Sequence, residues 1–181
     1  MIEFVRITTK EDPLLKRMQR TYQDAFPYKE RRDPQEVEDL LLYNPLTTVN
    51  AILNDGEYVG FLTYWTFTDF IYAEHFGIER NLRNNGIGGK AFFKFVSEAP
   101  VPVIGEVENP DNELAQRRTE FYKRMGLKLY NHPYFHPAFR KSGEKIKVCM
   151  VSYGDIDLEK EFDRIEKFLK VNVYSKEGML Q

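Results

Sequence analysis

The sequence has little cysteine and little histidine. Its one cysteine, Cys149, excludes a disulfide within the chain, and the apolar run Val148–Val151 around it indicates a buried strand thiol rather than a nucleophile. Of the 3 histidines, His132 and His136 lie in a proline-broken stretch rather than on a helix. We therefore expect no metal site.

Long apolar runs and a charge of one sign are also missing. No run approaches the roughly 18 apolar residues that a membrane-spanning helix needs, and Met1–Phe4 lacks the basic and apolar segments of a signal peptide. The 26 Lys and Arg against 28 Asp and Glu give a net charge of -2. This balance gives no electrostatic reason to expect nucleic acid or an anionic membrane as a partner, so we expect a cytoplasmic protein.

The chain does have enough apolar and aromatic sequence for one domain. Its 181 residues include 14 Phe and 11 Tyr, which suffices for a core without disulfides. The apolar periodicity and the cap and turn signals predict an α/β (α+β) sheet protein. In order, we expect a strand at 2–8, a helix from a Thr8-x-x-Glu11 capping box to Pro27, a helix from Asp33, strands at 47–53 and 57–67 joined by an Asn54-Asp55-Gly56 hairpin turn, a strand at 69–78, a helix ending before Pro100, a strand at 101–108, a helix from Asn112 to Gly126, strands at 127–131 and 146–153, and an amphipathic helix from Asp155.

The stretch 69–98 organises the rest of the chain. An aromatic and β-branched strand ends near Ile78, a polar loop follows at 80–89, and a helix then begins near Gly86–Gly89. Glycines let a phosphate approach the backbone, and the free N–H groups of the first helical turn carry partial positive charge. Arg83 adds a full charge. The loop therefore suits an anion, although glycines that only start a helix under a tight turn are an alternative.

A dinucleotide-binding fingerprint is a second alternative, because Gly86-x-Gly88-x-x-Ala91 fits its spacing and Glu106 and Glu108 follow about 20 residues later. Its placement is unfavourable. A Rossmann turn follows its strand almost directly, whereas a polar segment separates Ile78 from this helix, and the remaining chain is too short for a second βαβ half.

The run Arg83-Asn84-Asn85-Gly86-Ile87-Gly88 resembles the R/Q-x-x-G-x-G/A signature of the GNAT superfamily of acetyl-CoA-dependent N-acetyltransferases. A second segment, Phe121-Tyr122-Lys123-Arg124-Met125-Gly126-Leu127, resembles the family's F/Y-Y-x-x-x-G-F segment. The resemblance implies a single-domain fold with a mixed central sheet of about seven strands. It divides the chain into an acetyltransferase domain at 1–154 and a C-terminal helix and tail at 155–181 packed on the same domain.

The same resemblance implies acetyl-CoA as co-substrate, with no metal. The loop would hold its pyrophosphate, and the strand end would pair with its pantetheine arm. The residues implied are Phe76, Gly77, Ile78, Arg83, Asn84, Asn85, Gly86, Ile87, Gly88 and Gly89. The chain departs from the family where Ala115 and Arg118 replace an asparagine and a small residue, and Asn112 is a candidate for the first of these roles. Arg118 would reach a CoA phosphate or form a surface ion pair.

Acetyl transfer to an amine needs a neutral nucleophile and a proton for the departing thiolate. By resemblance, Tyr122 lies beside the CoA sulfur, where its hydroxyl can donate that proton, whereas a core tyrosine is the alternative. Glu74 is the first candidate for the base, because it matches a Glu of polyamine-type members and is expected on one strand face with Tyr72, Phe76 and Ile78. Glu106 and Glu108 are further candidates, acting through water. Each glutamate is otherwise a strand-surface carboxylate.

The sequence therefore favours direct acetyl transfer in a ternary complex. The N–H near Ile78 would polarise the thioester carbonyl, and the three carboxylates favour a small cationic amine acceptor. The segment 131–140 is expected as a loop over that acceptor, and 27–32 as a solvated loop or a further part of its site. A non-catalytic CoA-binding module and the dinucleotide-binding domain remain alternatives. A homodimer is left open.

Overall fold

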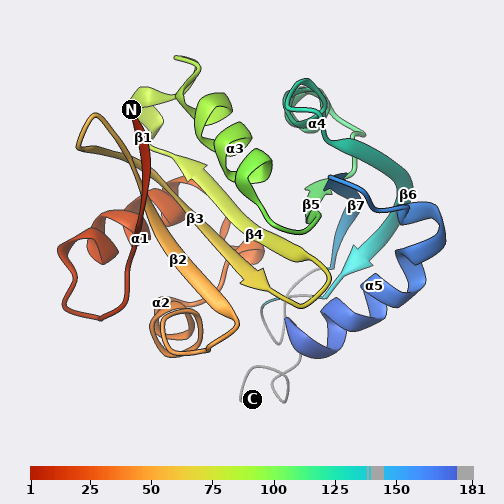
Figure 1. The fold of residues 1–181 in the computed structure, drawn as a ribbon, viewed down its shortest axis with the longest axis horizontal. Helices are drawn as coiled ribbons and strands as arrows, with labels where there is room; N and C mark the ends of the chain where they lie inside the picture. The colour runs from red at the N-terminus through yellow and green to blue at the C-terminus, as the bar shows by residue number, and fades with distance from the viewer. Residues whose placement is uncertain (138, 140–144, 175–181) are drawn as a thin grey trace.

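The computed structural model describes residues 1–137, 139 and 145–174, and its elements follow the predicted order (Figure 1). They are β1 (Ile2–Arg6), α1 (Pro13–Ala25), the 3-10 turn η1 (Tyr28–Glu30), α2 (Pro34–Glu36) continued by the π-helical turn η2 (Val37–Leu41), β2 (Thr47–Asn54), β3 (Glu57–Thr66), β4 (Ile71–Ile78), the 3-10 turn η3 (Arg80–Leu82), α3 (Ile87–Glu98), β5 (Val103–Glu108), α4 (Glu113–Arg124), β6 (Lys128–His136), β7 (Ile146–Tyr153) and α5 (Leu158–Asn172).

The strands form one seven-stranded mixed sheet in the order β1-β2-β3-β4-β5-β7-β6. β4 and β5 are parallel, and the other neighbouring strands are antiparallel. The predicted hairpin joins β2 to β3, with Asp55 at φ 53° and Gly56 at φ 82°, the positive angles that a tight two-residue hairpin turn requires. The predicted fold class is confirmed.

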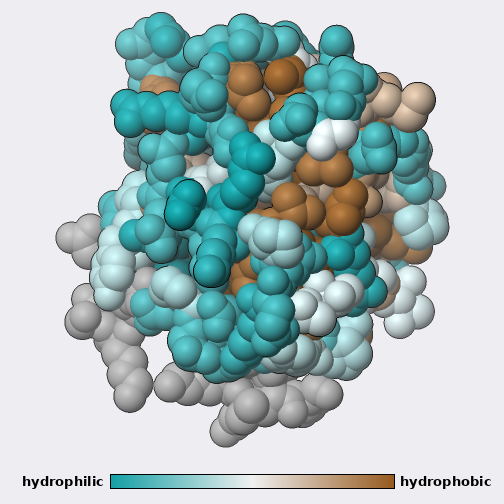
Figure 2. All heavy atoms as spheres, turned by 90° about the vertical axis from the view of Figure 1, so that its left-hand side faces the viewer, coloured by the Kyte–Doolittle hydropathy of each residue, from teal (hydrophilic) through white to brown (hydrophobic). Residues whose placement is uncertain are grey.

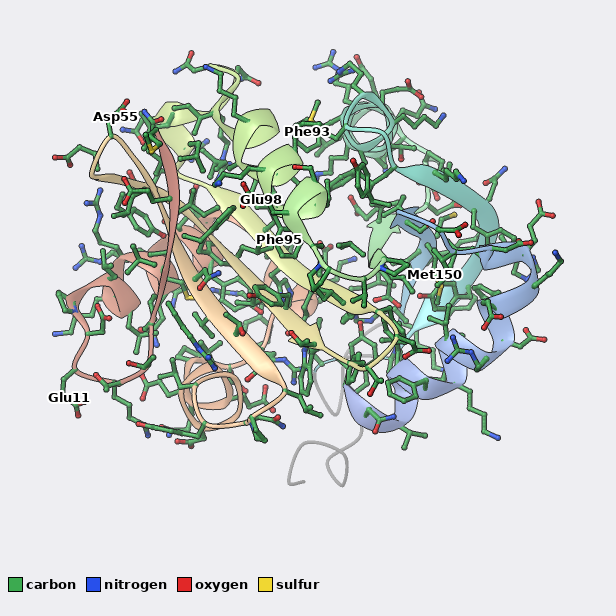
Figure 3. All side chains as sticks on the ribbon, viewed as in Figure 1. Glu11, Asp55, Phe93, Phe95, Glu98 and Met150 are labelled. Atoms are coloured by element: carbon green, nitrogen blue, oxygen red, sulfur yellow. The ribbon has the colours of Figure 1, made fainter. Side chains whose placement is uncertain are left out.

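Helices cover both faces of the sheet. One apolar cluster lies under α1 and α5 and includes Leu15, Met18 and Ile165; the other lies under α3 and α4 and includes Phe92 and Val96. Figure 3 labels Phe95 on α3, which belongs to the cluster under α3 and α4, and Met150 on β7, which belongs to the cluster under α1 and α5. The predicted apolar faces of α1, α3 and α5 are thus the buried ones, whereas Leu114 of α4 is 58% exposed, and Cys149 is a fully buried strand thiol.

Several predicted starts of helices and strands are wrong. β5 begins at Val103 rather than at 101, α5 begins at Leu158 rather than at Asp155, and the starts of α1 and β4 also differ. The N-cap of α1 is Asp12, whose carboxylate accepts from the N–H of Leu14, rather than Thr8. Pro13 at the first helical position favours this start because its ring presets a helical φ and its missing N–H is not needed there. β4 begins at Ile71, two residues later than predicted.

The predicted loop at 131–140 is mostly strand, because β6 continues to His136. A register shift between Tyr130 and Tyr134 interrupts its pairing with β7 around Pro133. Since β6 is an edge strand of the sheet, a proline without an N–H removes no bond to a second neighbour. Residues 138 and 140, which belong to this prediction, lie outside the described residues, as do residues 175–181 of the predicted C-terminal helix and tail at 155–181.

β4 and β5 pair over a short distance and then separate. Ile71–Ala73 pairs with Val103–Gly105, yet β4 continues to Ile78 and β5 to Glu108. Figure 1 shows the two strands diverging beyond this point. The divergence opens the middle of the sheet next to the N-terminus of α3.

A β-bulge lies in β4 at Glu74, where the register with β3 shifts by one residue. The extra residue reverses the alternation of faces, so Tyr72 lies in the cluster under α1 and α5, whereas Phe76 and Ile78 pack in the cluster under α3. The prediction that Glu74 shares a face with all three is therefore wrong for Phe76 and Ile78. A single inserted residue inverts a pattern of period two.

The face of the molecule drawn in Figure 2 is mainly hydrophilic. Figure 2 shows a small group of apolar side chains within that surface on the side where β1 forms the sheet edge. Ile2 and Phe4 of β1 are partly buried against the cluster under α3. Across the described ranges, no helix is both long enough and apolar enough to cross a bilayer.

Candidate active site

A cleft of about 1350 Å³ lies where β4 and β5 separate, between the N-terminal end of α3 and α4. Phe93 of α3 is 48% exposed and lines this cleft on the side of α3 towards α4 (Figure 3). Most residues predicted for the site line it together: Glu74, Phe76, Gly77, Ile78, Arg83, Asn84, Gly86, Gly88, Gly89, Glu106, Glu108, Arg118 and Tyr122. Asn85, Ile87 and Asn112 are not among its lining residues in the described part of the chain.

The α3 end of the cleft has the backbone shape of an anion site. Asn84 and Gly86 both adopt left-handed conformations, at φ 67° and φ 74°, and turn the chain into α3. The first N–H groups of any helix lack intrahelical acceptors, and no side chain caps α3 and no acidic residue occupies its first turn. A Cβ on Gly88 would lie 3.3 Å from Cγ1 of Ile78. Glycine therefore lets the first turn of α3 approach the end of β4.

The Arg83 side chain is bonded to neighbouring residues and holds this loop in place. Its Nε donates to the carbonyl oxygen of Ile78 at 2.9 Å, and its Nη2 forms an ion pair with Asp24 of α1 at 2.8 Å. The guanidinium thus ties the loop to β4 and α1. Its positive charge remains at the cleft wall, partly neutralised by the aspartate.

Asn112 and Arg118, two more residues predicted to contact the cofactor, are bonded to other residues of the chain. The Asn112 side chain caps α4 by accepting from the N–H of Ala115 at 2.9 Å. Arg118 forms a 2.7 Å ion pair with Glu108 across the gap between α4 and β5. Asn112 therefore positions the helix that carries Tyr122, and Arg118 lines the cleft as half of a pair.

The open edge of β4 presents amide groups to the cleft. The N–H of Glu79 donates to the Val59 carbonyl on β3. Successive strand residues direct their backbone groups to opposite sides, so those of Phe76 and Ile78 point away from β3. The Arg83 contact to the Ile78 carbonyl agrees with this orientation. Because pairing with β5 has ended by this point, this edge can pair with an extended ligand.

Tyr122 reaches the cleft from α4. Its ring packs edge-on against Phe92 of α3, with the ring centroids 5.1 Å apart. Tyr122 also lines a smaller cavity of about 60 Å³ that reaches between β4 and β5. Among the described residues its hydroxyl has no hydrogen-bond partner, and burial raises its pKa above the usual value of 10.0 despite the nearby Arg118 charge. The hydroxyl is therefore a protonated donor at neutral pH.

Glu74 is already occupied by a buried ion pair. Its carboxylate lies 2.6 Å from Nη2 of Arg32, both side chains are 1% exposed, and Trp65 Nε1 donates to it at 3.1 Å. Burial acts to raise the pKa of Glu74, but the Arg32 charge and these hydrogen bonds outweigh it, so the pKa is lowered. A carboxylate held this strongly in its ionised form is a poor proton acceptor, which weakens the prediction that Glu74 is the base.

Glu106 is a carboxylate that lines the cleft, and its side chain is 6% exposed. Its Oε2 accepts from the hydroxyls of Tyr72 at 2.7 Å and Tyr174 at 2.5 Å, and its Oε1 accepts from the Tyr134 hydroxyl. We call Glu106, Tyr72, Tyr134 and Tyr174 the Glu106 cluster. Nε2 of His136 lies 3.9 Å from Oε2. Four different elements or their ends, β4, β5, β6 and α5, thus meet at one carboxylate.

Sequence reasoning did not single out Tyr174, and it covered Arg32 and Tyr134 only as parts of the segments 27–32 and 131–140 that were considered for the acceptor site. The aromatic and histidine density of 131–140 drew attention to the segment that holds Tyr134 and His136. Nothing in the sequence near Tyr174 indicates a site, because the residue is defined by its contact with Glu106, 68 positions away.

The cleft mouth is acidic. Glu30 of η1 and Glu108 of β5 both line it, and burial together with the Glu108 charge raises the pKa of Glu30, against the opposing charge of Arg118. Glu106 lies deeper in the same cleft. This arrangement favours the binding of a positively charged ligand over that of an anion.

The chain is similar to known proteins in both sequence and fold. A model of the acetyltransferase (GNAT) family matches residues 15–127. A structure from Bacteroides thetaiotaomicron, described as an acetyltransferase of the GNAT family, has 31% sequence identity and a TM-score of 0.91, and the match covers 95% of this chain and 98% of that one. No curated protein matches the chain.

Two more distant structures share the fold. An aminoglycoside 6′-N-acetyltransferase complexed with coenzyme A has 16% identity and a TM-score of 0.58, covering 87% of this chain and 99% of that one. NAA60 from Arabidopsis thaliana in complex with acetyl-CoA has 20% identity and a TM-score of 0.58, covering 84% of this chain and 98% of that one.

Proposed function

The chain belongs to the GNAT family of acetyltransferases and is an acyltransferase, and we propose that it transfers the acetyl group of acetyl-CoA directly, in a ternary complex, to a primary amine of a small cationic acceptor. The observation that carries this proposal is the single cleft that joins the N-terminus of α3, the open edge of β4, Tyr122 and Glu106.

The residues present fit acetyl-CoA. The amides at the start of α3 would hold the pyrophosphate, because the left-handed Asn84 and Gly86 aim the turn at the cleft. The edge of β4 at Phe76–Ile78 would pair with the amide groups of the pantetheine arm. When bound, the thioester supplies an activated acyl group.

Three groups of this chain would then act on the transfer. The N–H of Ile78 donates towards the thioester carbonyl and stabilises developing negative charge. The Tyr122 hydroxyl, which is protonated and without a partner among the described residues, supplies the proton that the departing thiolate needs. Glu106 replaces Glu74 as our preferred base, because it lines the cleft and, among the described residues, has no arginine or lysine partner of the kind that holds Glu74.

The charged side chains that line the cleft indicate the chemical class of the acceptor. Glu30, Glu106 and Glu108 line the cleft, and Glu108 alone of these has an arginine partner, Arg118, among the described residues. A cation gains from this excess of carboxylates. Aminoglycosides, the substrates named for one fold neighbour, are cationic amino sugars of this kind.

Thiol release from acetyl-CoA across a panel of spermidine, tyramine, kanamycin and glutamate tests the proposal. We expect turnover with at least one cationic amine and none with glutamate, whose carboxylates the cleft would repel. A thermal shift with CoA but no turnover with any amine would instead identify a CoA-binding module. Stabilisation by NAD and not by CoA would contradict the proposal altogether.

A further inference from the structure

The end of α5 contacts the acceptor half of the cleft through three hydrogen bonds, one of which joins the Tyr174 and Tyr72 hydroxyls at 2.5 Å. The Tyr174 hydroxyl donates to Glu106 Oε2 at 2.5 Å, and the Val173 carbonyl accepts from Nη2 of Arg32 at 3.0 Å. Arg32 is the partner of Glu74. The end of α5 is therefore bonded directly to Glu106 of β5 and, through Arg32, linked to Glu74 of β4, although it follows the segment 15–127 that matches the family.

Tyr174 is packed as well as hydrogen-bonded. Its ring lies 4.7 Å from that of His136 and 5.7 Å from that of Phe139, measured between centroids. All three residues line the cleft with Glu106. Because the ring is held on these sides, its hydroxyl has a fixed position relative to the carboxylate.

The Glu106 cluster leaves the carboxylate little freedom. A carboxylate offers about four lone-pair positions, and three tyrosine hydroxyls take three of them, two on Oε2 and one on Oε1. Among the described residues, one position, on Oε1, has no donor. A donor that makes a single N–H contact, such as an ammonium group, fits that vacancy.

We propose that Tyr174 is a positioning residue for the acceptor amine, holding Glu106 Oε2 so that Oε1 faces the amine, and that the end of α5 is thus part of the acceptor site. This rests on the proposed function. The hydroxyl acts through Glu106, and it has no contact with the anion site at the start of α3 among the described residues.

Kinetics of Tyr174→Phe test this role, with Tyr130→Phe as the matched control. Tyr130 packs on Phe162 in the same interface of β6 with α5. We expect the KM of the accepted amine to rise roughly 10-fold in Tyr174→Phe, because a charge-assisted hydrogen bond to Glu106 is lost, while the KM of acetyl-CoA stays within twofold. Equal rises in both KM values, or none, would overturn the positioning role.

Amide hydrogen exchange gives a second readout that needs no acceptor. The N–H groups of Val173 and Tyr174 both donate to the Leu169 carbonyl. In Tyr174→Phe and in Glu106→Gln we expect these amides to exchange roughly 10-fold faster, with no change in Glu113→Gln, an exposed carboxylate of α4. Unchanged exchange in both variants would overturn the inference.

The two proposals fail separately. If the parent chain turns over no amine in the panel, the proposed function fails, and the exchange experiment alone decides whether α5 is bonded to Glu106. If the parent chain is active and Tyr174→Phe behaves like Tyr130→Phe, the proposed function stands and the inference fails.

Discussion

The proposed role of Tyr122 depends on its hydroxyl group alone. Replacement by Phe keeps the packing on Phe92 and removes the hydroxyl, so we expect kcat to fall by about 100-fold or less while the KM of acetyl-CoA is nearly unchanged. Because burial raises its pKa above 10.0, loss of its proton should not reduce kcat below about pH 10. Equal turnover in Tyr122→Phe, with Tyr130→Phe as control, would remove the hydroxyl from the mechanism.

A substitution at Glu74 tests whether its carboxylate has a structural or a catalytic role. Glu74→Gln removes the partner of a buried arginine, and we expect a loss of about 3–5 kcal/mol in the free energy of unfolding, measured by urea denaturation. Glu113→Gln, in an exposed pair with Arg117, should change stability little. A large fall in kcat at unchanged stability would restore Glu74 as the base.

His75 makes stability depend on pH. Burial lowers its pKa from 6.5 to about 4, against the opposing charge of Glu74, so the unfolded chain binds a proton before the folded chain does. Its contribution is complete above pH 6.5 and is lost as the pH falls towards 4, with a slope of about 1.4 kcal/mol per pH unit.

The variant His75→Gln should lose that slope. Urea denaturation at pH 6.5, 5.5 and 4.5 measures it, and His132→Gln, an exposed histidine of β6, serves as control. The same slope in His75→Gln as in the parent chain would contradict the assignment.

At this scale, the sequence indicates residue types but not their partners. Glu74 and Arg32 are 42 positions apart, and Glu106 and Tyr174 are 68 apart. No local sequence pattern predicts either contact, because both contacts depend on how the strands and helices assemble. The list of candidate carboxylates was therefore predictable, but which of them carries a buried ion pair was not.

The turn into α3 is the element on which the anion site depends. In Gly86→Ala the new Cβ meets open space, but φ 74° is unfavourable for alanine by about 1–2 kcal/mol. We expect the loop to relax and the affinity for CoA to fall roughly 10-fold, as measured by calorimetry.

Gly56→Ala provides a matched control. Gly56 has φ 82° and the same open surroundings, but it lies in the hairpin between β2 and β3. Its replacement should impose a similar strain without changing CoA affinity. Equal losses in the two variants would show that backbone strain alone, rather than the position beside the cleft, determines the effect.

Elements with local signals were predictable from the sequence. The hairpin at Asp55–Gly56 and the left-handed Gly126 after α4, at φ 86°, follow from residues that tolerate positive φ. The continuation of β6 past Pro133 and the bulge at Glu74 were not, because both are set by pairing with a neighbouring strand.

For the whole molecule, the order of elements followed from periodicity and turn signals, whereas the mixed sheet of about seven strands came with the family resemblance. The loop at 80–89 and the segment ending in Leu127 lie far apart in the sequence, yet Gly89 approaches Met125 and Phe121 where α3 packs on α4. The two motifs therefore meet at one cleft, and composition alone contains no signal of that meeting.

Calorimetric titration of the full chain with CoA, acetyl-CoA and NAD tests most directly whether the amides at the start of α3 hold a diphosphate while the edge of β4 holds the arm that follows it. We predict saturable heat at one site for CoA and acetyl-CoA, weakened in Gly86→Ala and unchanged in Gly56→Ala, with none for NAD. No heat from CoA or acetyl-CoA at millimolar concentration, or equal binding of NAD, would contradict it.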